Sequence, residues 1–148
     1  MIKSSDLDRF FLRRIGDPIH YSDKVPPLWI VERRLVQCQG GISAAYGAQQ
    51  IGVTALVIVY QTAIARGEEP GLVLAEVMFD KNCKYKVGDL AMLAWSASAG
   101  EERICRYCIV ARDIQDTGQA VQVKYHVSAQ HRDGNCSTML VMGEVELL

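Results

Sequence analysis

The stretch Ser43–Arg66, with the sequence SAAYGAQQIGVTALVIVYQTAIAR, sets the architecture that we expect of this chain. It follows the pair Gly40-Gly41, and its first charged residue is Arg66, after which a Gly-Glu-Glu-Pro segment ends it. A helix that is apolar on nearly all sides is wrapped by other structure. We therefore predict one long, buried helix over Ser43–Arg66.

The residues after this stretch have the pattern of antiparallel strands separated by turns. The segment Gln119–Gln130 alternates, so that one face is apolar and the other carries Gln122, Lys124, His126 and Ser128. Long strands with one apolar face need a cover, which the buried helix provides. The sequence thus predicts an α+β fold in which an antiparallel sheet wraps around that helix. The predicted strands are Leu72–Phe79, Tyr85–Ser98, Arg103–Ile114, Gln119–Gln130 and Ser137–Leu147.

The residues before the predicted helix form three segments. Ser4 or Ser5 can cap a short helix that runs to Arg14 and stops at Gly16. The next residues, 17–27, include three prolines and are expected to form a loop. The segment Trp29–Cys38 is expected to be a strand or a lead-in to the helix.

Length and charge limit the classes of protein to consider. The 148 residues suit one domain over residues 1–148. With 16 basic and 17 acidic residues the net charge is -1, which argues against a nucleic-acid partner. The apolar run Ile51–Ala65 has about 15 residues, whereas a membrane-spanning helix needs about 20. The N-terminus shows no secretory signal, so we expect a soluble, cytoplasmic protein without a membrane partner.

Five cysteines are scattered along the chain, an odd number that fits reduced thiols better than a disulfide framework. The one C-x-x-C motif, Cys105-Arg106-Tyr107-Cys108, lies in a predicted strand. Residues three apart on a strand point to opposite faces, so the two thiols are not placed to share a metal. We expect structural cysteines and no metal site.

The order of these elements resembles that of the MaoC-like hydratases and dehydratases, which have the hotdog fold. The stretch from Phe79 to Val87-Gly88-Asp89 resembles the family segment in which an apolar strand precedes P-V-x-x-G-D. The N-terminal sequence IGDPIHYSD, residues 15–23, resembles the family's GD-x-N-P-I-H-x-D. It also resembles the I-G-D-P-x-P-I-Y-x-D version of dehydratases whose first hotdog half binds substrate. The resemblance implies a hotdog fold for most of the chain.

In the family motif D-x-N-P-x-H, an Asp and a His move protons on an acyl thioester. Pro18 and His20 match the end of that motif. The Asp position falls on Ile15, and only a two-residue deletion aligns Asp17 with it. The resemblance therefore implies His20 as the catalytic residue and Asp17 as a conditional second one. The alternative is a turn at Asp17-Pro18 with a surface histidine.

The family usually carries a His-Gly pair at the hotdog helix, where a backbone N–H polarises the thioester carbonyl. This chain has no such histidine, but Gly41 or Gly47 could supply the N–H from the first turns of the predicted helix. The alternative is that these glycines are a helix break and a packing contact. Tyr46, Gln49 and Gln50 are polar groups in an apolar segment, so we expect them in a substrate tunnel or at a dimer seam.

The resemblance implies hydration or dehydration of a 3-hydroxyacyl or 2-enoyl thioester in metabolism of the fatty-acid or polyketide type. The acyl group would be carried by coenzyme A or by acyl carrier protein, and β-elimination requires no cofactor. Two alternatives are a hotdog acyl thioesterase and a non-catalytic, substrate-binding subunit that pairs with a catalytic hotdog subunit. Because the family's pockets lie between two units, we expect a homodimer or larger assembly.

The remaining polar residues have simpler interpretations. Glu32, within Val31-Glu32-Arg33-Arg34, is expected to be a solvated partner of one of the two arginines; the alternative is a base, if this segment borders a pocket. His126 and His131 are expected at the surface.

Overall fold

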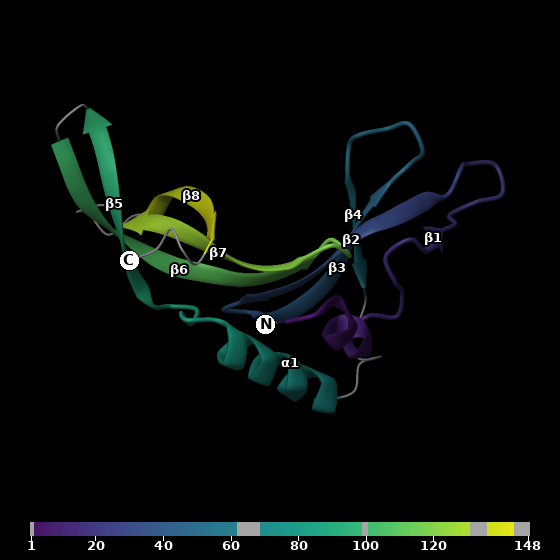
Figure 1. The fold of residues 1–148 in the computed structure, drawn as a ribbon, viewed down its shortest axis with the longest axis horizontal. Coiled ribbons are helices and arrows are strands. Elements are labelled where there is room, and N and C mark those ends of the chain that lie inside the picture. The colour runs from purple at the N-terminus through teal and green to yellow at the C-terminus, as the bar shows by residue number, and fades with distance from the viewer. Residues whose placement is uncertain (1, 62–68, 99–100, 131–135, 144–148) are drawn as a thin grey trace.

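The computed structural model describes residues 2–61, 69–98, 101–130 and 136–143 (Figure 1). The described residues form a 3-10 helix, an α-helix and eight strands. In chain order these elements are η1 Ser4–Phe10, β1 Pro18–Ile19, β2 Leu28–Cys38, β3 Gly41–Gln49, β4 Val57–Gln61, α1 Glu69–Asn82, β5 Leu90–Ser98, β6 Glu101–Asp116, β7 Val121–Gln130 and β8 Cys136–Gly143.

The strands form one antiparallel sheet in the order β4-β3-β2-β6-β7-β8, with β1 paired to β2 and β5 paired to β6. A mixed fold with an antiparallel sheet was predicted, and this part of the prediction is confirmed. Four predicted strands after residue 85 correspond to β5, β6, β7 and β8, and Trp29–Cys38 corresponds to β2. β2 joins the two parts of the sheet, because it pairs with β3 on one side and with β6 on the other.

The predicted long helix over Ser43–Arg66 is wrong. Residues 41–61 form the β3–β4 hairpin instead, and residues 62–66 lie outside the described residues. β4 has the sequence VIVYQ, whose β-branched and aromatic side chains fit a pleated surface better than a helix. Gly52, in the connection between the strands, has φ +80°, a left-handed conformation that ends regular structure.

The predicted strand Leu72–Phe79 is also wrong, because these residues lie in α1. Leu, Ala, Glu and Met within it favour a helix. Ala75 and Phe79, four residues apart, are both fully buried and form the face of α1 that packs on the sheet. α1 is thus the helix that covers the sheet. It begins at Glu69, which is 26 residues after Ser43, where the predicted helix begins. Within the described residues, no helix combines the length and apolar character needed to span a bilayer.

The hydrophobic core lies between the sheet and the two helices. In Figure 1, α1 runs along one side of the sheet, whereas β4 and the β5–β6 hairpin rise on the opposite side. The core therefore fills the α1 face of the sheet, and the opposite face is the concave one. The fully or almost fully buried core residues include Leu7, Phe10, Ile30, Leu35, Ala44, Tyr46, Ala48, Phe79 and Ile114.

A buried arginine attaches η1 to the sheet. Arg33 is 2% exposed, and its guanidinium donates to the Asp116 carboxylate at 2.9 and 3.1 Å. The same guanidinium donates to the Ser4 carbonyl at 2.9 Å, and the Ser4 hydroxyl donates to Asp116 at 2.7 Å. A short helix is present where one was predicted, but its N-cap is Lys3 rather than Ser4 or Ser5. It is of the 3-10 type and ends at Phe10 rather than Arg14.

Candidate functional site

The predicted catalytic pair lies at the edge of the fold. His20 follows β1 and is exposed, and Asp17 is half-buried in the turn before β1. The Asp17 carboxylate accepts a hydrogen bond from the Arg14 N–H at 2.8 Å, and its carbonyl accepts one from the Ile30 N–H at 3.0 Å. These contacts show Asp17 shaping the turn that brings β1 onto β2.

Gly41 lies far from this pair. β1 pairs with Leu28 and Trp29 at one end of β2, whereas Gly41 pairs with Cys38 at the other end. Ten residues of extended strand separate those ends, a length of about 30 Å. His20 and Gly41 therefore do not belong to one site. Gly41 and Gly47 also lie on a strand, not in the first turns of a helix.

Tyr46 is buried on the α1 face of β3 and holds the N-terminal segment against the hairpin. Its hydroxyl accepts a hydrogen bond from the Arg13 N–H at 3.0 Å and donates one to the Gln61 side chain. Burial raises the pKa of Tyr46 above its ordinary value, against the opposing effect of its hydrogen bonds with the backbone. Tyr46 is thus part of the core rather than of a substrate tunnel.

Gln49 and Gln50 do line a cleft, at the end of the β3–β4 hairpin. The cleft has a volume of about 390 Å³. The Gln49 amide donates to the Thr54 carbonyl at 2.8 Å and so fixes one wall of the cleft. The other lining residues are Trp29, Val31, Ile51, Gly52 and Val53.

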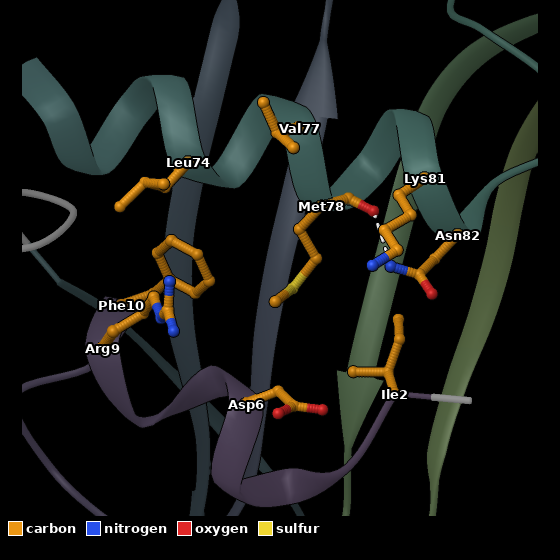
Figure 2. A pocket seen from close by; sticks show the side chains of 9 residues that line it. All are labelled: Ile2, Asp6, Arg9, Phe10, Leu74, Val77, Met78, Lys81 and Asn82. Carbon is orange, nitrogen blue, oxygen red and sulfur yellow. Dashed lines mark hydrogen bonds between the residues drawn. The ribbon is translucent and has the colours of Figure 1, made fainter.

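A second cleft, of about 330 Å³, lies between η1 and α1 (Figure 2). Phe10, Leu74 and Met78 line it with apolar groups, and the charged side chains of Arg9 and Lys81 extend beside them. Because both helices cover the core face of the sheet, this cleft opens on the side away from the concave face.

The concave face carries a cluster of polar side chains from three adjacent strands. Arg33 and Asp116 point toward η1, so their neighbours in the alternating strands β2 and β6 point to the other face. We define the polar cluster as Glu32 and Arg34 of β2, Asp113 and Gln115 of β6, and His126 of β7. Strand pairing brings them together. Arg34 lies opposite Gln115, and His126 lies opposite Ala111, which is two residues from Asp113 and on the same face of β6.

Asp113 is the centre of the polar cluster. It is fully buried, and its carboxylate binds the Arg34 guanidinium and lies 3.2 Å from His126 Nε2. Burial alone would raise the pKa of Asp113, but the hydrogen bonds from His126 and Arg34 outweigh burial and hold that pKa below its ordinary value. The hydrogen bond to Asp113 in turn raises the pKa of Arg34. The cluster therefore contains a buried carboxylate that is ionised at neutral pH.

Glu32 forms the other part of the polar cluster. It is 6% exposed and accepts a hydrogen bond from the Gln115 amide at 2.5 Å. The expectation of a solvated Glu32 is wrong, although its charge does act on a neighbouring arginine and helps to raise the pKa of Arg34. The backbone of Gly47 lies against the Glu32 side chain: a β-carbon at Gly47 would stand 2.4 Å from Glu32 Cγ, so any larger residue there requires the Glu32 side chain to shift.

The arrangement of Asp113 and His126 suits proton transfer. An ionised Asp113 can only accept a hydrogen bond, so His126 Nε2–H is the donor and Nδ1 is the ring nitrogen that can take a proton. The His126 side chain is 22% exposed, so it is half-buried rather than a simple surface residue, although its predicted position on the polar face of β7 is confirmed. His131 lies outside the described residues. No group of three or more metal-ligating side chains occurs in the described ranges.

Sequence reasoning missed Arg34, Asp113 and Gln115. The available signal was the presence of charged residues at the centre of two strands, in VERRLV of β2 and ARDIQD of β6.

No protein-family model matches the chain, and neither curated proteins nor solved structures give a significant match.

Proposed function

We propose that the chain is an acid–base enzyme that hydrates or dehydrates an acyl thioester, with His126 as the residue that moves the proton. The observation that carries this proposal is the buried Asp113 carboxylate, which binds both Arg34 and His126. A carboxylate in this position orients the imidazole and stabilises its charged form, the role that an Asp plays beside a catalytic His. His126 and Asp113 thus replace His20 and Asp17 as the catalytic pair.

In the dehydration direction, His126 Nδ1 takes a proton from the carbon next to the thioester carbonyl. The electron pair of that C–H bond forms the double bond, and the C3–oxygen bond breaks. The imidazolium returns its proton to the departing hydroxyl, which leaves as water. Arg34 is the positive charge nearest to this histidine in the polar cluster, and it stabilises the negative charge that develops on the carbonyl oxygen.

The cleft beside Gln49 supports an apolar acyl group as the rest of the substrate. Gln49 is two residues from Gly47 on β3, so its side chain is on the same face of the sheet as Glu32. Val31, which lines the cleft, is adjacent to Glu32 in sequence. The cleft adjoins the Glu32 end of the polar cluster, whereas His126 lies beside Ala111 at the level of Cys38, about seven strand residues or 20 Å further along β2. Only a long acyl chain in the cleft would therefore place its thioester end at His126.

The hotdog fold is part of this proposal. α1 covers the sheet in place of the expected central helix, but it lies on the convex face, so the sheet does not wrap around it as predicted (Figure 1). The long antiparallel strands β5 to β8 follow it in the chain. We also propose that coenzyme A or acyl carrier protein carries the acyl group and that the protein is cytoplasmic. The free thiols of Cys38 and Cys108 support a reducing compartment.

The test compares two histidine variants on a panel of short-chain and long-chain enoyl and hydroxyacyl coenzyme A thioesters. Hydration is followed by the loss of the ultraviolet absorbance of the enoyl thioester. His126→Ala is expected to lower kcat/KM by about 10²–10⁴-fold, the usual contribution of a positioned acid or base. His20→Ala, the matched control at an exposed histidine, is expected to retain the activity of the unaltered chain.

The reverse result, with activity lost only in His20→Ala, would return the catalytic role to His20. Release of free thiol without hydration would identify a thioesterase. Activity that appears only after a second hotdog subunit is added would identify a substrate-binding subunit.

A further inference from the structure

The cleft between η1 and α1, called the η1–α1 cleft below, combines an apolar interior with positive charge (Figure 2). Phe10 is almost fully buried and Met78 is half-buried, so these two side chains form its inner surface. Leu74 and Val77 also line it and are 44% and 55% exposed. Its volume of about 330 Å³ is at the lower end of the range for small-molecule sites, about 300–1,000 Å³.

Two cations and one carboxylate line the η1–α1 cleft, which leaves an excess of positive charge. The cations are Arg9 of η1 and Lys81 of α1, and the carboxylate is Asp6. Asp6 is engaged at the start of η1, where it accepts a hydrogen bond from the Lys3 N–H at 2.9 Å. Within the described part of the chain, the side chains of Arg9 and Lys81 form no hydrogen bond or ion pair. Both are exposed and accessible to a ligand.

The aspartate next to Arg9 does not neutralise it. Asp8 precedes Arg9 in η1, and its carboxylate binds the guanidinium of the buried Arg33 of β2 at 3.0 Å. The negative charge of Asp8 is thus directed to the sheet, whereas Arg9 lines the cleft.

α1 repeats this arrangement. Asp80 precedes Lys81, and its carboxylate binds the guanidinium of the buried Arg112 of β6 at 3.0 Å. Lys81 extends from α1 toward the cleft (Figure 2). Each helix therefore binds the sheet through an aspartate and presents the cation that follows it to the same cleft.

We propose that the η1–α1 cleft binds a fatty carboxylate. The alkyl chain covers Phe10 and Met78, and the carboxylate is held at the mouth by Arg9 and Lys81. An arginine or lysine forms charge-assisted hydrogen bonds with a carboxylate, which a neutral or cationic molecule of the same chain length does not receive. Because η1 and α1 cover the convex face, this site is separate from the polar cluster and does not depend on the chemistry proposed for His126.

Calorimetric titration of the full chain with three ligands of equal chain length tests the role of charge. The ligands are decanoate, decanol and decyltrimethylammonium, each below the concentration at which it forms micelles. Decanoate is expected to bind once per chain and the other two at least about 10-fold more weakly, because they lack the hydrogen bonds to charged groups. No binding of decanoate, or equal binding of decanoate and decyltrimethylammonium, would overturn the proposal.

Two double variants locate the carboxylate. Arg9→Gln combined with Lys81→Gln should weaken decanoate binding by about 10-fold or more and leave the binding of decanol unchanged. Lys24→Gln combined with Lys86→Gln, at two exposed lysines that do not line the cleft, is the charge-matched control and should bind decanoate as the unaltered chain does. Equal weakening in both double variants would show a response to overall charge and would overturn the proposal.

The cleft beside Gln49 is the competing apolar site. Val53→Lys places a charge on an exposed residue of that cleft and should leave decanoate binding unchanged. Loss of decanoate binding in Val53→Lys, with full binding in the Arg9 and Lys81 double variant, would place the ligand there and contradict the proposal.

Protection of Lys81 in the unaltered chain covers the case in which a variant fails to fold, as judged by circular dichroism. Reductive methylation of lysines is followed by mass spectrometry with and without saturating decanoate. Lys81 is expected to react more slowly when decanoate is bound, and Lys86, the exposed reference, at the same rate. Equal rates at Lys81 with and without bound decanoate would contradict the assignment.

Discussion

Gly47 lies opposite Glu32 in the pairing of β3 with β2, and the Glu32 side chain occupies the space that a β-carbon at position 47 would need. Such a β-carbon would stand 2.4, 2.6 and 2.8 Å from three Glu32 atoms. Glu32 is itself held by Gln115, so it cannot move without giving up that hydrogen bond. The small residue on β3 and the buried carboxylate on β2 are thus a matched pair.

The Gly47→Ala variant should lose about 1–3 kcal/mol of unfolding free energy, the usual cost of overpacking a filled site. Urea unfolding followed by circular dichroism measures the loss. Glu32→Ala removes the obstructing side chain, so adding Gly47→Ala to it should cost clearly less than Gly47→Ala does alone. Additive costs in this double-mutant cycle would show that the contact does not limit position 47.

Stability near and below pH 4 should depend on Asp113. Its pKa in the folded chain lies below the ordinary value of 3.8, so the ionised form stabilises the fold above that pH. This contribution is lost as the pH falls through the lowered pKa. Asp113→Asn should therefore destabilise the chain at pH 7, and the difference from the unaltered chain should shrink as the pH falls below about 4.

Chemical unfolding at a series of pH values gives that difference directly. Asp89→Asn, at an exposed carboxylate, is a suitable control because it lies in the turn before β5. A penalty for Asp113→Asn that stays constant from neutral to acid pH would contradict the ionised, paired state of Asp113.

Arg33 should be the most sensitive charged position among the described residues. Arg33→Gln leaves the fully buried Asp116 without its guanidinium partner, and breaking a buried pair in this way costs about 3–5 kcal/mol. Asp8→Asn removes only the exposed partner of the same arginine and should cost less than about 1 kcal/mol. Thermal unfolding of both variants compares them, and equal costs would show that η1 is not anchored through Asp116.

Tyr46 should make the fold sensitive to alkali. Its pKa is raised above 10.0 in the folded chain, so the neutral hydroxyl contributes stability that is lost as the pH rises past the ordinary value. Tyr46→Phe leaves the Arg13 N–H without its acceptor and should cost about 1–3 kcal/mol at neutral pH.

In the Phe variant the alkaline loss should be smaller, because one buried ionisable group is gone. Unfolding free energies at neutral and alkaline pH test this expectation. Tyr21→Phe, at an exposed tyrosine in the loop after β1, is the matched control. An alkaline loss in Tyr46→Phe equal to that of the unaltered chain would argue against a role for this hydroxyl.

The strands with a clear alternation could be predicted from the sequence, and the two apolar segments could not. In β7 the residues Val123, Tyr125 and Val127 alternate with polar ones, which identified both the strand and its faces. Ser43–Arg66 carries apolar residues on every side, because β3 is buried on both faces and β4 is an apolar edge. A continuous apolar run fits a buried helix as well as a hairpin, and periodicity alone does not separate the two.

The candidate site could not be predicted because it depends on pairing between distant strands. Asp113 meets Arg34 across 79 residues of sequence, and Glu32 meets Gln115 across 83. Nothing local in either segment specifies those partners. The resemblance pointed instead to His20 and Gly41, which are short motif matches that strand pairing places at opposite ends of β2.

The adjacent arginines Arg33 and Arg34 fix the alignment of β2 against β6. One binds Asp116 on the core face and the other binds Asp113 on the concave face, so both sides of the same strand pair carry an ion pair. A slip of one residue would send every side chain of β2 to the opposite face and separate both pairs at once. The two ion pairs are costly to bury, but they also disfavour a one-residue slip between β2 and β6. They thereby hold the two halves of the sheet in the observed register.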